Sequence, residues 1–200
     1  MVMTNNTMNT TATTTDNTTD NTMEVNAMNT TAVNATNGSA NGTGSAPAGL
    51  PRVNVAAAAP KAFKALIGFD AAARAGLDPA LVELVLIRSS QLNHCAYCLH
   101  MHISDARKAG ESDERMHMVG VWREAPHFFT AQEQAALALT ETITLVAENG
   151  VPDEVYARAA AHFDEEGLAH LIALICAINT WNRLALAGAK IAGRDERAGR

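Results

Sequence analysis

The sequence predicts an all-α fold of about seven helices, preceded by a disordered tail. Of the 200 residues, 48% are hydrophobic, which is enough to form the core of one compact domain. After residue 50 the chain is rich in alanine, and its apolar residues recur at helical spacing. Runs of β-branched residues are few, and no Asn-Gly turn joins two apolar stretches as in a β-hairpin. These observations divide the chain into a tail (1–49), a helical domain (50–192) and a frayed, charged end (193–200).

Residues 1–49 differ in composition from the rest of the chain. They are mostly Thr, Asn, Ala, Gly and Ser, and no Leu, Ile, Phe, Tyr or Trp occurs before Leu50. Such a segment cannot bury enough apolar area to offset the conformational entropy lost on folding. Tracts rich in Asn and Thr can also stack as β-aggregates, but the dispersed Gly and acidic residues weaken that alternative. We therefore expect residues 1–49 to be disordered.

Charge and hydropathy argue against two classes of partner. The net charge is −6 at pH 7, and half of it belongs to Asp16, Asp20 and Glu24 in the tail. The mildly acidic remainder argues against nucleic acid as a partner. No run of about 18 apolar residues occurs, and the N-terminus lacks the basic and apolar regions of a signal peptide. The sequence therefore predicts a cytoplasmic protein that binds neither nucleic acid nor membrane.

Three helices are expected before residue 110, each bounded by a cap or a stop signal. Asp78 is a good N-cap, and Pro79 suits the first helical position. The helix that follows surrounds Glu83 with aliphatic residues on nearly every side, so it should be largely buried. Gly76, Asn93-His94 and Gly110 end or break the pattern, and the expected ranges are 60–75, 79–92 and 95–109.

Four more helices are expected between residues 112 and 188. Ser112 precedes two acidic residues, which is typical of a helix start. Thr130 and Glu133 fit a capping box. Pro152 and Asp164 open the last two helices, of which the final one is long and apolar. The expected ranges are 112–122, 130–149, 152–163 and 164–188.

The residues that carry chemistry lie between positions 83 and 102. On a helix that begins near Cys95, the i, i+4 relation places His102 on the same face as Cys98, where an imidazole can take the thiol proton or hold the thiolate. Cys95 lies at the helix start, where unpaired N–H groups and the helix dipole lower a thiol pKa. A Cys-x-x-Cys pair at a helix start can also close a disulfide within one turn. The spacing therefore predicts a small thiol redox site.

Glu83 adds a feature that a plain dithiol lacks. A carboxylate among aliphatic neighbours is unfavourable to bury unless it has a partner. His102 is a suitable partner, because a carboxylate fixes the tautomer of the ring and raises its basicity. The sequence thus favours a relay from Glu83 through His102 to Cys98, which follows the logic of an activated nucleophile.

Other interpretations of these residues stay open. The cysteine pair and the histidine could form half of a zinc site with Glu83 as fourth ligand, although structural zinc sites usually have a second Cys/His pair. Glu83 could also be an ordinary acid on a helix surface. Cys176 is expected to be a buried small apolar residue, and His94 and His100 are expected to be bystanders. Packing or an oligomer interface is expected for Met116, Met118 and Trp122. Core packing and a polar contact between helices are expected for Trp181, Asn182 and Arg183, with pocket lining as the alternative.

Four chemically distinct positions at fixed spacing give the chain a resemblance to a known family. Glu83, Cys95, Cys98 and His102 together resemble the core motif of the AhpD-like alkylhydroperoxidases, which belong to the carboxymuconolactone decarboxylase superfamily. The likeness extends from about residue 52 to residue 186. Three segments look like the peroxidase-related branch of that superfamily, namely DARKAG (105–110), VWREAP (121–126) and AINTWNRLA (177–185).

The resemblance implies a helical fold that assembles into homo-oligomers, trimers or hexamers, with the site near subunit contacts. It assigns Cys98 as the peroxidatic thiol, activated by His102 and Glu83. It assigns Cys95, nearer the surface, as the resolving thiol that exchanges with a dithiol reductant. The best-studied type has a histidine directly before the second cysteine, where this chain has Tyr97, so a proton-transfer role there is not carried over. The decarboxylase branch lacks the cysteine pair, so that activity is not transferred.

The leading hypothesis is a thiol-dependent hydroperoxidase with an antioxidant role. The Cys98 thiolate would reduce a hydroperoxide and become a sulfenic acid, and Cys95 would condense with it into a redox-active disulfide. A dithiol reductant protein would then restore the thiols by exchange, and no haem, flavin or metal cofactor is expected. Two alternatives use the same residues: a disulfide-exchange adaptor for another peroxidase, and a non-catalytic helical oligomer with a metal or redox-sensing site.

Overall fold

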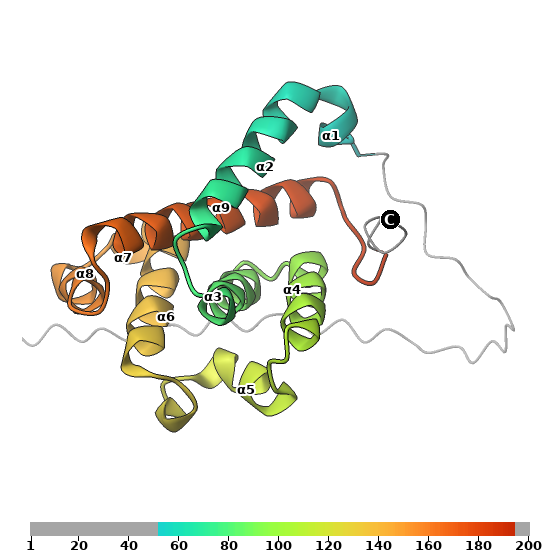
Figure 1. Ribbon diagram of the computed structural model, residues 1–200. Coiled ribbons are helices and arrows are strands. Elements are labelled where there is room, and N and C mark those ends of the chain that lie inside the picture. The colour runs from blue at the N-terminus through green and yellow to red at the C-terminus, as the bar shows by residue number, and fades with distance from the viewer. Residues whose placement is uncertain (1–51, 195–200) are drawn as a thin grey trace, which may run out of the picture. The chain divides into compact units, whose positions relative to one another are not determined.

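In a computed structural model of the protein, residues 52–194 are described, and they form a bundle of helices (Figure 1). The predicted disordered tail, residues 1–49, lies outside the described residues, as does most of the predicted frayed end, residues 195–200. The helices are α1 (Val55–Ala58), α2 (Pro60–Arg74), α3 (Pro79–Leu92), α4 (Ala96–Lys108), α5 (Asp113–Met118), α6 (Ala131–Thr144), α7 (Val146–Asn149), α8 (Asp153–Ala160) and α9 (Glu165–Ala187), with 3-10 turns η1 (Val119–Val121) and η2 (Pro126–Phe128).

The all-α prediction is confirmed, and the seven predicted ranges each contain a helix. The differences concern short pieces. The single-turn helix α1 was not predicted, because four residues are too few to show a helical period. The predicted range 130–149 divides at Leu145, whose backbone (φ −101°, ψ 30°) interrupts the helix between α6 and α7. The predicted range 112–122 is α5 followed by the tighter turn η1.

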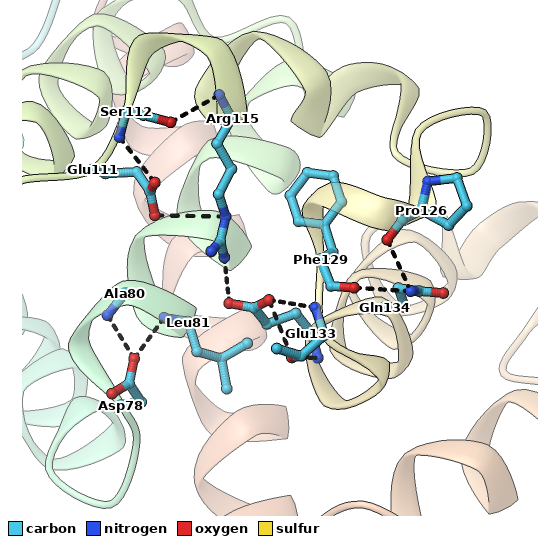
Figure 2. A network of polar contacts seen from close by, with 11 residues as sticks. Asp78, Ala80, Leu81, Glu111, Ser112, Arg115, Pro126, Phe129, Glu133 and Gln134 are labelled. Carbon is cyan, nitrogen blue, oxygen red and sulfur yellow. Dashed lines mark hydrogen bonds and ion pairs between the residues drawn. The ribbon is translucent and has the colours of Figure 1, made fainter.

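Side-chain caps fix where the helices begin. The Asp78 carboxylate accepts hydrogen bonds from the backbone N–H of Ala80 (2.9 Å) and of Leu81 (3.2 Å), which starts α3 as predicted. The capping box of Thr130 and Glu133 starts α6. Figure 2 shows the Asp78 cap, together with Arg115 of α5 reaching across to the Glu133 carboxylate. These contacts determine the residues at which α3 and α6 begin and join α5 to α6.

Helix α3 lies at the centre of the bundle and contacts α4, α6 and α9 (Figure 1). The side chains of Leu84, Val85, Leu86 and Ile87 are each at most 1% exposed, so this helix is buried on nearly every side, as predicted. Val85 and Leu86 belong to a core cluster shared with α6 and α9, whereas Leu84 and Ile87 belong to one shared with α4, α5 and α6. Packing on both sides holds the helix that carries Glu83 in a fixed position.

Helix α9 is the longest helix among residues 52–194. It is long and apolar enough to cross a membrane, and no other helix among the described residues meets this test of length and composition. One of its faces is an integral part of the core, where Leu171, Leu174, Ile175 and Ile178 are at most 1% exposed. Core helices of soluble proteins pass the same test of length and composition, so the finding adds little on its own.

Candidate active site

The turn between α3 and α4 determines where the first cysteine lies. Asn93 closes α3, and the following residue, His94, has a positive φ of 53° that reverses the chain direction. The backbone N–H of Cys95 then donates to the carbonyl of Ser90 at 2.9 Å. Cys95 becomes the N-cap of α4, and its sulfur accepts a hydrogen bond from the backbone N–H of Cys98 at 3.4 Å. The predicted break and the predicted helix start are both confirmed.

Both thiols lie inside the domain. Cys95 is 1% exposed and Cys98 is 2% exposed, and they pack together with Ala185 of α9. They are not joined by a disulfide in this structure. The expectation that Cys95 lies nearer the surface is wrong for the described chain, because the N-cap position directs Cys95 against α9 instead of toward solvent. Burial therefore does not separate the roles of the two cysteines.

The environment of Cys95 favours its thiolate. The pKa of Cys95 is lowered to about 7, chiefly by a hydrogen bond from the Cys98 side chain and against an opposing effect of burial. The backbone N–H groups of Cys98 and Tyr97, and in smaller part the side chain of Asn182, contribute to this lowering. The sequence predicted a lowered pKa at this helix start, and the direction is confirmed.

This lowered pKa makes a prediction about stability. Cys95 is an acid whose pKa is lower in the folded state (about 7) than in the unfolded chain (about 8.5), so ionisation favours folding. The contribution is complete above about pH 8.5 and is lost as the pH falls through about 7. We expect the free energy of unfolding of the wild type, relative to Cys95→Ser, to rise by on the order of 1–2 kcal/mol between about pH 6 and pH 9.

Urea denaturation of both proteins in the presence of a reducing agent measures this difference. Cys176→Ser is the matched control, because that cysteine is exposed and distant in sequence from the pair. A difference between wild type and Cys95→Ser that does not change with pH would contradict the assignment of a stabilised thiolate to Cys95.

The predicted carboxylate–histidine pair is present. Nδ1 of His102 lies 3.2 Å from Oε2 of Glu83, and the histidine is 2% exposed. The pairing joins α3 to α4 across their packed faces. Nε2 of His102 is buried and has no hydrogen-bond partner among residues 52–194. The predicted contact between His102 and Glu83 is therefore made, whereas Nε2 of His102 makes no hydrogen bond to Cys98 in this structure.

Sequence reasoning missed a cation beside Glu83. Nη1 of Arg74 lies 3.5 Å from Oε1 of Glu83, and Nε of Arg74 donates to Asp70 at 2.8 Å. The guanidinium balances part of the charge of a carboxylate whose side chain is only 15% exposed. The i, i+4 spacing of Asp70 and Arg74 was visible in the sequence, but it gave no indication that Arg74 would reach across to the next helix.

Helix α9 contributes the polar side chain of Asn182 near the end of α3. Asn182 is completely buried, accepts a hydrogen bond from Nδ2 of Asn93 at 2.9 Å, and donates to the hydroxyl of Ser90 at 3.2 Å. This confirms the expected polar contact between helices. The residues on either side of Asn182 also make structural contacts. Trp181 packs edge to face on Phe63 with ring centroids 5.2 Å apart, and the Arg183 guanidinium donates hydrogen bonds to Asn179.

The segment VWREAP forms a structural cluster on α3 and α6. Burial of the Glu141 carboxyl opposes its ionisation, but hydrogen bonds from Trp122, Arg88 and Arg123 outweigh this effect and lower its pKa below the ordinary value. The ring of Trp122 is 4% exposed and packs in the core with Met116, as predicted for both residues. This segment therefore anchors α3, which carries Glu83.

The remaining sequence predictions have mixed outcomes. The prediction that Cys176 is buried is wrong, because its position on α9 lies outside the core-facing stripe and is exposed. His94 and His100 are both exposed. In the described part of the chain, no three His, Cys, Asp or Glu side chains gather in a way that could hold a metal ion, so the zinc interpretation gains no support from their arrangement.

The sequence is similar to proteins of one family. Residues 57–142 match the carboxymuconolactone decarboxylase family. The uncharacterized protein YdfG of Bacillus subtilis is 40% identical over 137 residues, which cover 68% of this chain and 92% of that protein. The uncharacterized protein YnjA of Escherichia coli is 34% identical over 110 residues, which cover 54% of this chain and 59% of that protein.

Solved structures show the same fold. A protein of unknown function from Agrobacterium tumefaciens, named as a candidate antioxidant defence protein AhpD, is 36% identical with a TM-score of 0.68, over 72% of this chain and 99% of that one. A peroxidase-related protein from Silicibacter is 22% identical with a TM-score of 0.57, over 67% and 70% of the two chains. The debrominase Bmp8 is 19% identical with a TM-score of 0.63, over 71% and 76%. At these lower identities the likeness concerns the fold alone.

Proposed function

The chain belongs to the carboxymuconolactone decarboxylase family and has the AhpD-like fold, and from this premise we propose that it is a thiol-dependent hydroperoxidase. One observation carries the proposal: His102 is held by Glu83 at 3.2 Å, one helical turn from Cys98 in a buried cysteine pair. A buried imidazole with one nitrogen fixed by a carboxylate has its other nitrogen available for proton transfer. The cytoplasmic location expected from the sequence is part of this proposal.

The first step is reduction of the hydroperoxide by Cys98. Its thiolate sulfur attacks the terminal peroxide oxygen, the O–O bond breaks, and Cys98 becomes a sulfenic acid. The thiol proton passes to His102 and from there to the departing alkoxide, which leaves as an alcohol. Nε2 of His102 suits this transfer because it is buried and no described residue bonds to it. Glu83 stabilises the imidazolium that forms in between.

The second step regenerates the enzyme. The Cys95 thiolate attacks the sulfenic sulfur of Cys98, an S–S bond forms, and the hydroxyl leaves as water after taking up one proton. A dithiol reductant then exchanges with this disulfide and leaves oxidised, with both cysteines reduced. The lowered pKa of Cys95 supports this role, since the thiolate is the attacking species.

A disulfide-exchange adaptor is the second candidate function, and the same observation at Cys95 favours it. A thiol with a pKa of about 7 is well suited to exchange electrons with a partner protein. Steady-state assays separate the two candidates. A hydroperoxidase consumes hydroperoxide with a dithiol reductant alone, whereas an adaptor does so only when a partner peroxidase is added.

We also propose that the protein forms homo-oligomers through α2 and the end of α9. Large apolar side chains are exposed there, with Ile67 at 50%, Phe69 at 44% and Leu186 at 48%. Contiguous exposed apolar surface marks interaction sites on soluble proteins. We expect the wild type to elute with light-scattering mass near three or six times 21.1 kDa.

Phe69→Lys should shift this mass toward the monomer. Val146→Lys is the matched control, because Val146 is 52% exposed but lies on α7. A monomeric wild type, or equal effects of the two variants, would contradict the proposed surface.

A further inference from the structure

A row of charged side chains leads from α2 to the buried imidazole of His102. Nε of Arg74 donates to Oδ2 of Asp70 at 2.8 Å, and Nη1 of Arg74 lies 3.5 Å from Oε1 of Glu83. The other oxygen of Glu83, Oε2, lies 3.2 Å from Nδ1 of His102. Glu83 therefore uses one carboxylate oxygen for a cation and the other for the imidazole.

The two ends of this row are buried polar atoms without hydrogen-bond partners. Among residues 52–194, three buried side-chain atoms lack a partner, and Oδ1 of Asp70 and Nε2 of His102 are two of them. The third is Nε of Arg115, which lies 3.7 Å from the carboxylate of Glu111. Native proteins leave few such atoms, and a catalytic role is one of the explanations for those that remain. The row thus joins an unsatisfied acceptor at one end to the nitrogen available for proton transfer at the other.

The charges in this row do not cancel while His102 is neutral. Two ionised carboxylates, Asp70 and Glu83, share the one guanidinium of Arg74, which leaves one net negative charge. A proton accepted by His102 brings the net charge of the row to zero. The row therefore favours the imidazolium, and the guanidinium keeps the two carboxylates from repelling each other.

The end of α2 is fixed against α9, which keeps Arg74 in place. Nδ1 of His170 lies 3.2 Å from the carbonyl oxygen of Ala73, the residue before Arg74. The same ring lies so close to Gly76 that a Cβ atom there would be 2.3 Å from its Cδ2 atom. The backbone on both sides of Arg74 is therefore held by α9, and a fixed backbone gives the guanidinium a fixed origin.

We infer that Arg74 is a positioning residue for Glu83: its guanidinium, held by Asp70, keeps the carboxylate directed at the imidazole. What this does in a reaction rests on the proposed function. A carboxylate held in this way stabilises the imidazolium that forms when His102 takes the thiol proton of Cys98. Without the guanidinium, Asp70 and Glu83 would repel each other, and Glu83 would no longer be held at the ring. Arg74 touches no reacting atom, so it acts only through Glu83.

The test is a double-mutant cycle on the full-length chain. Arg74→Met and Glu83→Gln are made singly and together, and sulfenic acid formation is followed in a single turnover. We expect Arg74→Met to lower this rate about fivefold. The double variant should be no slower than Glu83→Gln alone, because Arg74 acts through Glu83. Losses that multiply in the double variant would overturn the inference.

Two further arginine variants separate the charge of Arg74 from a general loss of structure. Arg74→Lys keeps a cation and should stay within about twofold of the wild type, whereas a loss as large as that of Arg74→Met would overturn the inference. Arg107→Met is the matched control. Arg107 also lies in the last turn of its helix and pairs with an aspartate, Asp113, at 2.7 Å, but it is on α4 and its side chain is 56% exposed. We expect an unchanged rate, and equal losses in Arg107→Met and Arg74→Met would overturn the inference.

Urea denaturation separates this inference from the proposed function, because it requires no reaction. If the guanidinium holds Glu83, Arg74→Met should shift the urea midpoint more in the wild type than in the Glu83→Gln background. Arg74→Gln replaces Arg74→Met in both cycles if the methionine variant does not fold. Equal shifts in the two backgrounds would overturn the inference, even if the wild type reduces hydroperoxides. A smaller shift in the Glu83→Gln background would support it, even if the wild type proved to be an adaptor and not a peroxidase.

Discussion

Cys98→Ser is expected to lower hydroperoxide turnover with a dithiol reductant by at least about a thousandfold, because a serine hydroxyl cannot replace a thiolate as the nucleophile. Cys98 is 2% exposed and lies one turn from His102 on α4. The exchange of sulfur for oxygen changes the volume little, so the fold should persist. Consumption of hydroperoxide is followed at saturating reductant, with circular dichroism as the check on folding.

Two further serine variants make this prediction specific. Cys95→Ser should lose steady-state turnover but still reduce about one hydroperoxide per chain, because the resolving thiol is needed only after the first step. Cys176→Ser should behave as the wild type, because that residue is exposed and outside the pair. Full turnover in Cys98→Ser would exclude the proposed mechanism, whatever the other variants do.

His102→Gln is expected to lower the rate of the peroxide step by about a hundredfold, the usual contribution of a general acid–base group. Glu83→Gln should cost about tenfold, because an amide still contacts Nδ1 of His102 but no longer stabilises the imidazolium. Single-turnover kinetics of sulfenic acid formation measure this step apart from resolution.

An exposed histidine on the same helix provides the control for the relay. His100 precedes His102 by two residues and points to solvent, so His100→Gln should leave the peroxide step unchanged. Equal losses in the two histidine variants would mean that the effect comes from α4 as a whole. An unchanged rate in His102→Gln would remove the relay from the mechanism while leaving the role of Cys98 open.

Much of the fold was predictable because its signals are local. Caps such as Asp78 and the box of Thr130 and Glu133 depend on a few adjacent residues, and each begins a helix where expected. The pairing of Glu83 with His102 could also be predicted, because a carboxylate inside an apolar helix requires a partner. The need of the Glu83 carboxylate for a partner thus predicted the contact between α3 and α4.

The rest depended on how the helices pack. Arg74 reaches Glu83 only because of the turn between α2 and α3, which no spacing rule specifies. The wrong prediction for Cys176 has a similar origin, since apolar residues surround it in sequence but the helix turns it away from the core. The burial of Cys95 depends on α9, which is distant in sequence and packs Ala185 against it.

Cys98 is proposed as the thiol that reduces the hydroperoxide. The most direct measurement treats reduced Cys95→Ser with one equivalent of hydroperoxide, traps sulfenic acid with a selective reagent, and locates the adduct by mass spectrometry. We expect one adduct per chain on Cys98, with its yield sharply reduced by His102→Gln. An unmodified Cys98, together with hydroperoxide consumption by the same sample, would contradict the account.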